Sequence, residues 1–338
     1  MSFSYWSKQL KSLLSVSGLS KNFVKELDSF QRVANLFGES TKKETVYAVD
    51  DISFDVMTGE VVGLVGESGC GKSTVARMIS GILEPTSGEI IFKGERISLN
   101  GSPVKKEHLL SIQMVFQNPF SSLNPRLKVV DIVGEAPVHH GLVNRKNRDD
   151  YVKNFLTLAG LDEQFLNRYP HQLSGGQRQR TGIARALAVN PDFLICDEAI
   201  AALDVSIQAQ IINLFKDLRD KLELTYLFIS HDLSAVENIS DRVIIMYLGR
   251  IVEVATTEQI FGSPNHPYTR ALLEEIPRLD RRKRKFSVIK GEVPSPINPP
   301  SGCHFHPRCP YAIKRCKIEV PKLENIANGH QSACHLNI

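Results

Sequence analysis

Residues 61–74 read Val61-Val62-Gly63-Leu64-Val65-Gly66-Glu67-Ser68-Gly69-Cys70-Gly71-Lys72-Ser73-Thr74. The first five are apolar and mostly branched, which is typical of a buried parallel strand. The next nine match a phosphate loop, the glycine-rich turn that joins a strand to a helix. Apolar residues then recur at helical spacing at Val75, Ala76, Met78 and Ile79. This stretch predicts a strand, a phosphate-binding turn and a helix in an α/β fold.

Each residue type in the loop has a chemical role. Glycines let the backbone approach a ligand closely, and the amides they expose form a nest for anionic oxygens. Lys72 can reach the β- and γ-phosphates of a nucleotide, and the Ser73 hydroxyl can ligate Mg²⁺. The alternative is an ordinary glycine–serine loop before a surface helix, which the flanking strand and helix disfavour. We therefore predict a nucleoside triphosphate site with Mg²⁺.

The composition indicates one large core with a smaller appendage. The chain has 338 residues, of which 42% are hydrophobic and 23% charged. No apolar run approaches the ~20 residues needed to span a bilayer. Met1 to Leu14 includes Lys8 and Lys11, so we expect no secretory signal. The net charge of +4 does not favour a nucleic-acid partner.

Two alternating stretches, residues 14–23 and 46–56, come before the phosphate loop. We expect them to form a small antiparallel sheet that covers the nucleotide, after an N-terminal extension over residues 1–13. An aromatic side chain there could stack on adenine, and Phe23 is the first candidate, with Tyr47 second. The alternative for each is an aromatic buried in the sheet.

Four polar groups stand at the ends of buried apolar strands: Gln117, Asp197, Glu198 and His231. In an open α/β sheet, ligands bind at the carboxyl ends of the strands. Asp197 is expected to hold Mg²⁺, and Glu198 to face the γ-phosphate and orient a water molecule. His231 is expected to reach the γ-phosphate. The alternatives are an acidic surface turn and a structural histidine.

A second glycine-rich helix start reads Leu173-Ser174-Gly175-Gly176-Gln177. The N-terminus of a helix is suited to bind an anion, so this segment predicts a second phosphate contact. Its alternative is a plain helix cap. The residues before it are expected to be helical, in a subdomain over about residues 118–178.

Four of the six cysteines lie within the last 36 residues: Cys303, Cys309, Cys316 and Cys334. Without an export signal, a disulfide framework is not expected. Four thiolates could hold a [4Fe–4S] cluster or a structural Zn²⁺. The spacings are wider than in zinc sites, and Cys309 precedes a proline as in bacterial ferredoxins, so we favour iron–sulfur. The alternative is four unligated thiols.

Taken in order, these motifs, together with Asp204, resemble the nucleotide-binding subunit of ATP-binding cassette (ABC) transporters over about residues 14–263. Leu173–Gln177 is the most specific piece. Residues 264–338 are similar to the tail of oligopeptide/dipeptide importer ATPases, through Asn265–Leu273, Gly291–Pro296 and the cysteines. Residues 199–201 read Ala-Ile-Ala where the family often has proline, and no catalytic group is lost.

The resemblance implies a P-loop NTPase core with a mostly parallel sheet and flanking helices, an antiparallel β subdomain, a helical subdomain and a small Cys-rich C-terminal domain. It implies a head-to-tail pair of ATPase subunits, in which Leu173–Gln177 of one contacts the ATP of the other. Glu198 is then the general base, His231 holds the γ-phosphate, and Asp204 shapes the dimer contact. Gln117 senses the γ-phosphate and contributes to the Mg²⁺ site.

The resemblance also implies partners. These are a second ATPase subunit, usually a paralogue, two transmembrane permease subunits, and indirectly an extracytoplasmic substrate-binding protein. The chain is expected on the cytoplasmic side of the cell membrane as a peripheral subunit. It would energise uptake of oligopeptides or dipeptides, or alternatively of nickel, glutathione or another small solute. Similar importer tails can carry a [4Fe–4S] cluster. A cassette ATPase acting on nucleic acid is disfavoured, because residues 118–172 are too short for a long coiled coil.

Overall fold

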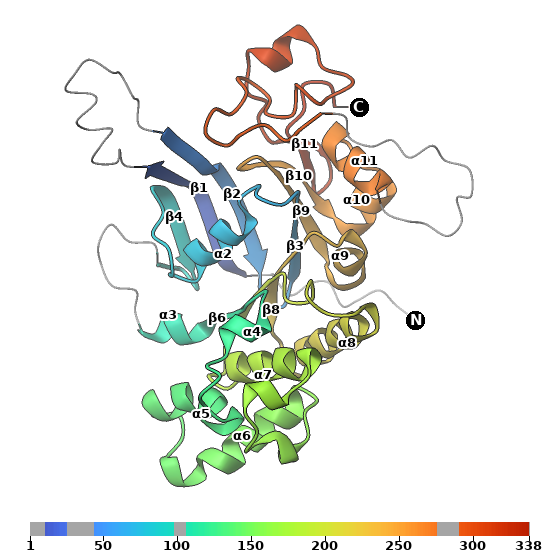
Figure 1. Ribbon diagram of the computed structural model, residues 1–338. Coiled ribbons are helices and arrows are strands. Elements are labelled where there is room, and N and C mark those ends of the chain that lie inside the picture. The colour runs from blue at the N-terminus through green and yellow to red at the C-terminus, as the bar shows by residue number, and fades with distance from the viewer. Residues whose placement is uncertain (1–10, 26–43, 98–105, 276–290, 338) are drawn as a thin grey trace, which may run out of the picture.

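A computed structural model of the chain describes residues 11–25, 44–97, 106–275 and 291–337 (Figure 1). The predicted strand is β3 (Val61–Val65), and the predicted helix is α2 (Lys72–Ile79). Both predictions are confirmed. Most of the expected N-terminal extension lies outside the described residues, and β1 begins at Ser12, two residues before the expected domain start.

The main sheet runs in the order β11-β12-β10-β9-β3-β8-β7-β6. Its strands beside β3 are β6 (Ile112–Val115), β7 (Phe193–Asp197), β8 (Thr225–Ser230), β9 (Arg242–Tyr247), β10 (Arg250–Thr256), β11 (Glu324–Ala327) and β12 (His330–Ser332). The five strands from β9 to β6 are mutually parallel, whereas β10, β12 and β11 pair antiparallel. Parallel pairing brings the carboxyl ends of β3, β6, β7 and β8 to one edge.

The second sheet is antiparallel, with strand order β2-β1-β4-β5. Its strands are β1 (Ser12–Lys25), β2 (Glu44–Met57), β4 (Ser87–Phe92) and β5 (Glu95–Arg96). The expected antiparallel sheet before the phosphate loop is thus present, with β4 and β5 added after the loop.

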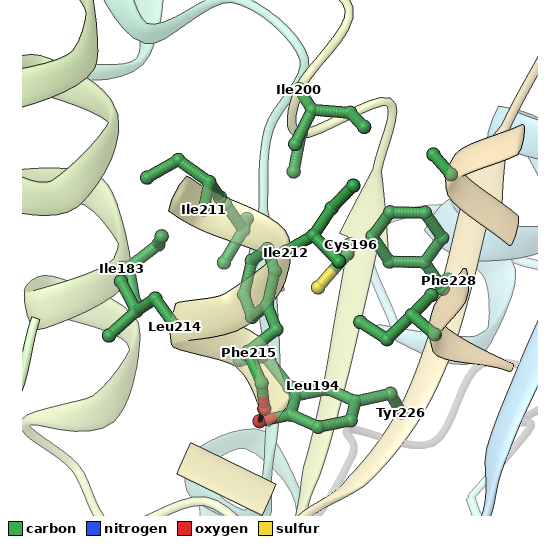
Figure 2. Close-up of a cluster of buried hydrophobic side chains, with 14 of the residues drawn as sticks. Ile183, Leu194, Cys196, Ile200, Ile211, Ile212, Leu214, Phe215, Tyr226 and Phe228 are labelled. Carbon is green, nitrogen blue, oxygen red and sulfur yellow. Dashed lines mark hydrogen bonds between the residues drawn. The ribbon is translucent and has the colours of Figure 1, made fainter. Parts of the chain in front are cut away.

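β3 lies between two hydrophobic cores. Val61 and Val65 belong to one core, which the helices on that face of the sheet complete. Val62 and Leu64 point the other way, into a core shared with α2 and the antiparallel sheet. Figure 2 shows part of the first core, where Phe215 of α8 (Val205–Leu222) packs against Tyr226 and Phe228 of β8. A strand buried on both faces explains the unbroken apolar run at 61–65.

The remaining helices are α3 (Lys106–Ser111), α4 (Pro119–Ser122), α5 (Val129–His139), α6 (Arg148–Leu158), α7 (Gly175–Leu187), α8 (Val205–Leu222), α9 (Leu233–Ile239), α10 (Thr257–Gly262) and α11 (Pro267–Glu274). Short 3₁₀ turns are η1 (Arg145–Asn147), η2 (Glu163–Phe165), η3 (Pro170–Gln172) and η4 (Lys314–Lys317). Helices α5, α6 and α7 pack together as a helical region (Figure 1). Within the described ranges, no helix combines the length and apolarity required to cross a bilayer.

The C-terminal region is built into the main sheet and its core. β12 pairs with β10, so β11 and β12 lengthen the main sheet. Beneath that pairing, the fully buried Glu253 carboxylate accepts hydrogen bonds from the amides of Asn265 (2.6 Å) and His266 (3.0 Å). Nε2 of His330 lies 2.7 Å from the same carboxylate. The expectation of a small Cys-rich C-terminal domain is therefore not supported, because β11 and β12 share the main sheet and Phe305 belongs to its core.

Candidate functional site

The phosphate loop connects β3 to α2 and is closed on itself. The Lys72 ammonium is buried and donates to the carbonyls of Gly66 (2.8 Å) and Glu67 (2.9 Å). Cys70 is also buried, with its sulfur 3.8 Å from the Lys72 nitrogen, and burial raises the pKa of its thiol. Ser68 and Gly69 are exposed at the tip of the loop. The loop therefore presents its tip to solvent and holds its cation in place underneath.

Gly71 is a position that requires glycine. Its φ is 108°, and a Cβ built there would lie 2.2 Å from the carbonyl oxygen of Ala48 in β2. The residue is also the N-cap of α2. Because the antiparallel sheet approaches so closely, the loop can enter the helix at this angle only without a side chain.

Ser73 and Asp197 meet although 124 residues separate them. The Ser73 hydroxyl donates to Oδ1 of Asp197 at 2.9 Å. Burial raises the pKa of the Asp197 carboxyl, the Ser73 hydrogen bond lowers it, and the charge of Glu198 raises it further. A hydroxyl and a carboxylate are oxygen donors of the kind Mg²⁺ prefers, and phosphates and water normally complete its shell. The pair fits such an ion.

Two more of the predicted site residues, Gln117 and His231, lie against the Glu198 carboxylate. The Gln117 amide donates to Oε2 of Glu198 at 2.5 Å, and Nδ1 of His231 lies 3.5 Å from Oε1. Glu198 itself has a φ of 48°, a left-handed conformation that is costly for a residue with a side chain. Its amide donates to the Ile229 carbonyl at 2.9 Å, which holds the turn. Groups from the ends of β6, β7 and β8 thus converge on one carboxylate.

We expect Asp197→Asn to stabilise the fold and to abolish Mg²⁺-dependent ATP hydrolysis. Because the folded-state pKa lies above the ordinary value of 3.8, the wild type loses stability as the pH rises through that interval. The loss is therefore larger at pH 7 than at pH 4, so the variant should unfold at a higher temperature at pH 7, with a smaller gain at pH 4. Removing the carboxylate should lower hydrolysis by about 10²-fold or more.

The measurements are thermal unfolding at both pH values and phosphate release with Mg²⁺. Asp217→Asn, an exposed acid on α8, is the matched control and should change neither. A lower unfolding temperature for Asp197→Asn at pH 7 would mean that its bond with Ser73 outweighs the cost of burial.

The segment Leu173–Gln177 starts α7 and caps it. The exposed Ser174 hydroxyl accepts from the Gln177 amide at 3.3 Å, and the Gln177 side chain accepts from the Ser174 amide at 2.9 Å. This reciprocal pair is a capping box. In the part of the chain that the structure describes, no hydrogen bond joins this segment to residues 66–74. Within one chain, the two glycine-rich helix starts are therefore separate sites.

Asp204 lies beside this segment as the exposed N-cap of α8. Its carbonyl accepts from the amides of Ile207 and Gln208, each at 2.9 Å. A Cβ on Gly176 would lie 2.9 Å from the Ile207 side chain, so the start of α7 packs closely on the start of α8. The two predicted dimer-contact elements thus share one surface.

The adenine candidates are both exposed rather than buried in the sheet. Phe23 is 42% exposed and Tyr47 is 39% exposed, and their strands pair side by side in β1 and β2. The Lys21 ammonium lies 5.3 Å from the centre of the Phe23 ring. The Tyr47 amide donates to the Pro296 carbonyl at 3.0 Å. An exposed ring on the sheet that packs against the loop could stack on a base.

The cysteines of the C-terminal region lie near one another without forming a ligand set. Burial raises the pKa of the Cys303 thiol to about 11, and Cys316, Cys309 and Cys334 add to that rise. All four are free. Among the described residues, no group of three or more His, Cys, Asp or Glu side chains is arranged to hold a metal ion. The predicted [4Fe–4S] or Zn²⁺ site is therefore not supported, because metal binding needs converging thiolates.

One set of contacts to the phosphate loop has no signal in the sequence. Arg308 donates to the Glu67 carboxylate at 2.8 and 3.1 Å, and the Glu67 amide donates to the Tyr268 hydroxyl at 2.9 Å. Because 241 residues separate Arg308 from Glu67, no local pattern could have paired them.

Comparison with known proteins agrees with this geometry. Residues 49–201 match the family model "ABC transporter", and residues 252–316 match "Oligopeptide/dipeptide transporter, C-terminal region". The chain is 50% identical to the oligopeptide transport ATP-binding protein AppF of Bacillus subtilis, covering 86% of this chain and 90% of that one. It is 48% identical to the dipeptide transport ATP-binding protein DppF of Haemophilus influenzae, covering 88% and 91%.

Solved structures show a similar fold. The chain matches a dimeric, post-hydrolysis state of the ATP-binding cassette MJ0796 bound to ADP and phosphate, with a TM-score of 0.60 and 27% identity over 72% of this chain and 98% of that one. It matches cbiO1 from Clostridium perfringens, part of an ABC transporter complex, with the same TM-score and identity over 75% and 91%.

Proposed function

This chain belongs to the ABC transporter family and is one of its ATP-hydrolysing subunits, and from that premise we propose that it energises the import of oligopeptides or dipeptides through a membrane permease. The observation that carries the proposal is the convergence of Gln117 and His231 on Glu198, beside the Ser73–Asp197 pair. Its peptide specificity is supported by the match of residues 252–316 and by the relatives' names.

The chain's own residues divide the work of hydrolysis. Lys72 turns from the loop carbonyls to the β- and γ-phosphates, and the loop amides bind the phosphate oxygens. Glu198 accepts a proton from the attacking water, and His231 contacts the γ-phosphate. Ser73 and Asp197, with Gln117 beside them, would hold Mg²⁺, which when bound would supply neutralisation of phosphate charge. Catalysis is then mostly positioning and charge stabilisation.

One chain supplies two incomplete halves of an ATP site. Within the described residues, the capped segment at Ser174 makes no hydrogen bond to its own phosphate loop, which leaves it to serve a partner's nucleotide. We propose a head-to-tail pair with a second ATPase subunit, usually a paralogue, in which Asp204 contributes to the contact. The solved MJ0796 cassette is dimeric. The pair would sit on two permease subunits at the cytoplasmic face of the membrane. An extracytoplasmic substrate-binding protein would be an indirect partner.

Two finer assignments belong to the same proposal. Phe23 stacks on adenine, because it is the more exposed of the two aromatic candidates. The thiols of Cys303, Cys309, Cys316 and Cys334 could close on a [4Fe–4S] cluster only if they move closer together than they stand here. Iron, sulfide and zinc analysis of the protein purified without oxygen tests the second assignment, and absence of all three would remove it.

Transport by the assembled complex tests the main proposal. The chain is purified with its permease subunits and second ATPase subunit, reconstituted into proteoliposomes with the binding protein, and given di- to pentapeptides or nickel. We expect ATP-dependent peptide uptake that disappears when Lys72→Ala replaces the wild type. Uptake of nickel but not of peptides would show that the transported solute is nickel. A chain that fails to associate with the permease would contradict the transport role.

A further inference from the structure

The C-terminal region reaches around to the phosphate loop and holds it at Glu67. Both oxygens of the Glu67 carboxylate accept from the Arg308 guanidinium, at 2.8 and 3.1 Å. The Glu67 amide donates to the Tyr268 hydroxyl at 2.9 Å. The side chain and the backbone of one loop residue are thus both bound by residues that follow the cassette core.

The ion pair between Arg308 and Glu67 belongs to the strong class of ion pairs. The Arg308 side chain is only 6% exposed and that of Glu67 is 21% exposed. A forked arginine–carboxylate pair fixes direction as well as distance. Shielding from water also strengthens it, whereas exposed ion pairs contribute little.

Aromatic packing sets the position of the arginine. Its guanidinium carbon lies 5.9 Å from the centre of the Tyr247 ring. That ring packs against Tyr268 and Phe305, with centroids 4.6 and 5.3 Å away. Tyr247 ends β9, Tyr268 is in α11 and Phe305 precedes Arg308, so three separate segments aim the arginine at the loop.

Because Glu67 also binds Lys72, the contacts of Arg308 and Tyr268 with Glu67 help to position the Lys72 ammonium. Its carbonyl is one of the two that hold the Lys72 ammonium, at 2.9 Å. The residue is therefore bound on one side by Arg308 and Tyr268 and on the other by Lys72. Movement of Glu67 would displace both the loop amides and the lysine that meet the phosphates.

We propose that Arg308 and Tyr268 are positioning residues for ATP, so that the C-terminal region forms part of the nucleotide site in its own chain. The inference rests on the proposed function, because it concerns the same ATP. The Arg308 contact is not what holds the C-terminal region in place. The β10–β12 pairing and the buried Glu253–His330 contact anchor that region independently, so it stays docked when the Arg308 contact is lost.

The test measures binding of a fluorescent ATP analogue to the full-length chain with Mg²⁺, and the Michaelis constant for ATP in the assembled transporter. We expect Arg308→Ala to weaken nucleotide binding by about tenfold, as for a coupled buried pair. The Michaelis constant should rise by the same factor, while the turnover rate at saturating ATP stays within about twofold. Tyr268→Phe, which removes only the hydroxyl, should act in the same direction with a smaller effect.

Two further variants make the result specific. Arg315→Ala removes an exposed ion pair with Glu319 in the same region and should leave nucleotide affinity unchanged. Arg308→Ala combined with Glu67→Gln should bind no worse than the weaker single variant, because both remove one interaction. An unchanged nucleotide affinity in Arg308→Ala with a lowered unfolding temperature would reduce the contact to a structural role. A wild type that binds no ATP would instead overturn the proposed function.

Discussion

Glu198→Gln will bind ATP and will hydrolyse it about 10³-fold more slowly than the wild type, the range expected when a general base is removed. The substitution keeps the shape of the side chain but removes its capacity to accept a proton. Gln117 and His231 contact that carboxylate in the structure, so the water it orients would lie between the ends of β6, β7 and β8. Phosphate release and nucleotide binding, measured on one preparation, separate the two effects.

The same variant gives a test of the paired site. With hydrolysis blocked, a stable dimer or heterodimer should accumulate when ATP is added, and light scattering detects it. Adding Ser174→Arg should abolish that association and leave nucleotide binding by the single chain unchanged, because the side chain of Ser174 is hydrogen-bonded within the start of α7 and not to the phosphate loop. A Glu198→Gln protein that hydrolyses ATP at the wild-type rate would show that another group activates the water.

Gly71→Ala will lower ATP affinity by about 10²-fold, the cost of moving reacting groups by roughly 1 Å. A methyl group there would meet the Ala48 carbonyl oxygen at 2.2 Å, and this neighbour is backbone, which cannot move aside as the nearby end of the Met246 side chain can. The loop must shift, and the start of α2 must shift with it. Isothermal titration with Mg²⁺ and ATP measures the affinity, and thermal unfolding checks the fold.

Gly59→Ala is the control that isolates the clash. Gly59 also has a positive φ, of 76°, but a Cβ there meets nothing within 4 Å. Its replacement should cost stability by about 1–2 kcal/mol through the left-handed backbone alone and leave ATP affinity intact. If both variants bound ATP equally well, the approach of β2 to Gly71 would have no part in nucleotide binding.

The parts of the site that could be predicted are those with a local signal. A phosphate loop is a contiguous pattern, and the strand over residues 61–65 and a helix starting near Lys72 followed from it, as β3 and α2 confirm. Gln117, Glu198 and His231 come from distant segments, yet each follows an apolar strand. Parallel strands share one edge for their carboxyl ends, so their meeting could be expected before any coordinates.

What could not be predicted depends on contacts without a local pattern. The strand β11 is mostly exposed, and β12 consists of the polar residues His330, Gln331 and Ser332, so only the pairing with β10 makes them part of the main sheet. For that reason the sequence alone predicts a small C-terminal domain instead of an extension of the sheet. The four cysteines suggested a metal site, but spacing along the chain does not determine whether sulfurs converge in space.

The place of β12 in the sheet has a consequence for biosynthesis. Residues 330–332 are synthesised long after β10, and until they emerge from the ribosome β10 lacks this neighbour and Glu253 lacks His330. A nascent chain therefore completes this part of its sheet only once β12 has been made. Chains terminated before β12 should expose that edge and be open to proteolysis. Damaged messenger RNAs would then yield few truncated subunits able to compete for the permease.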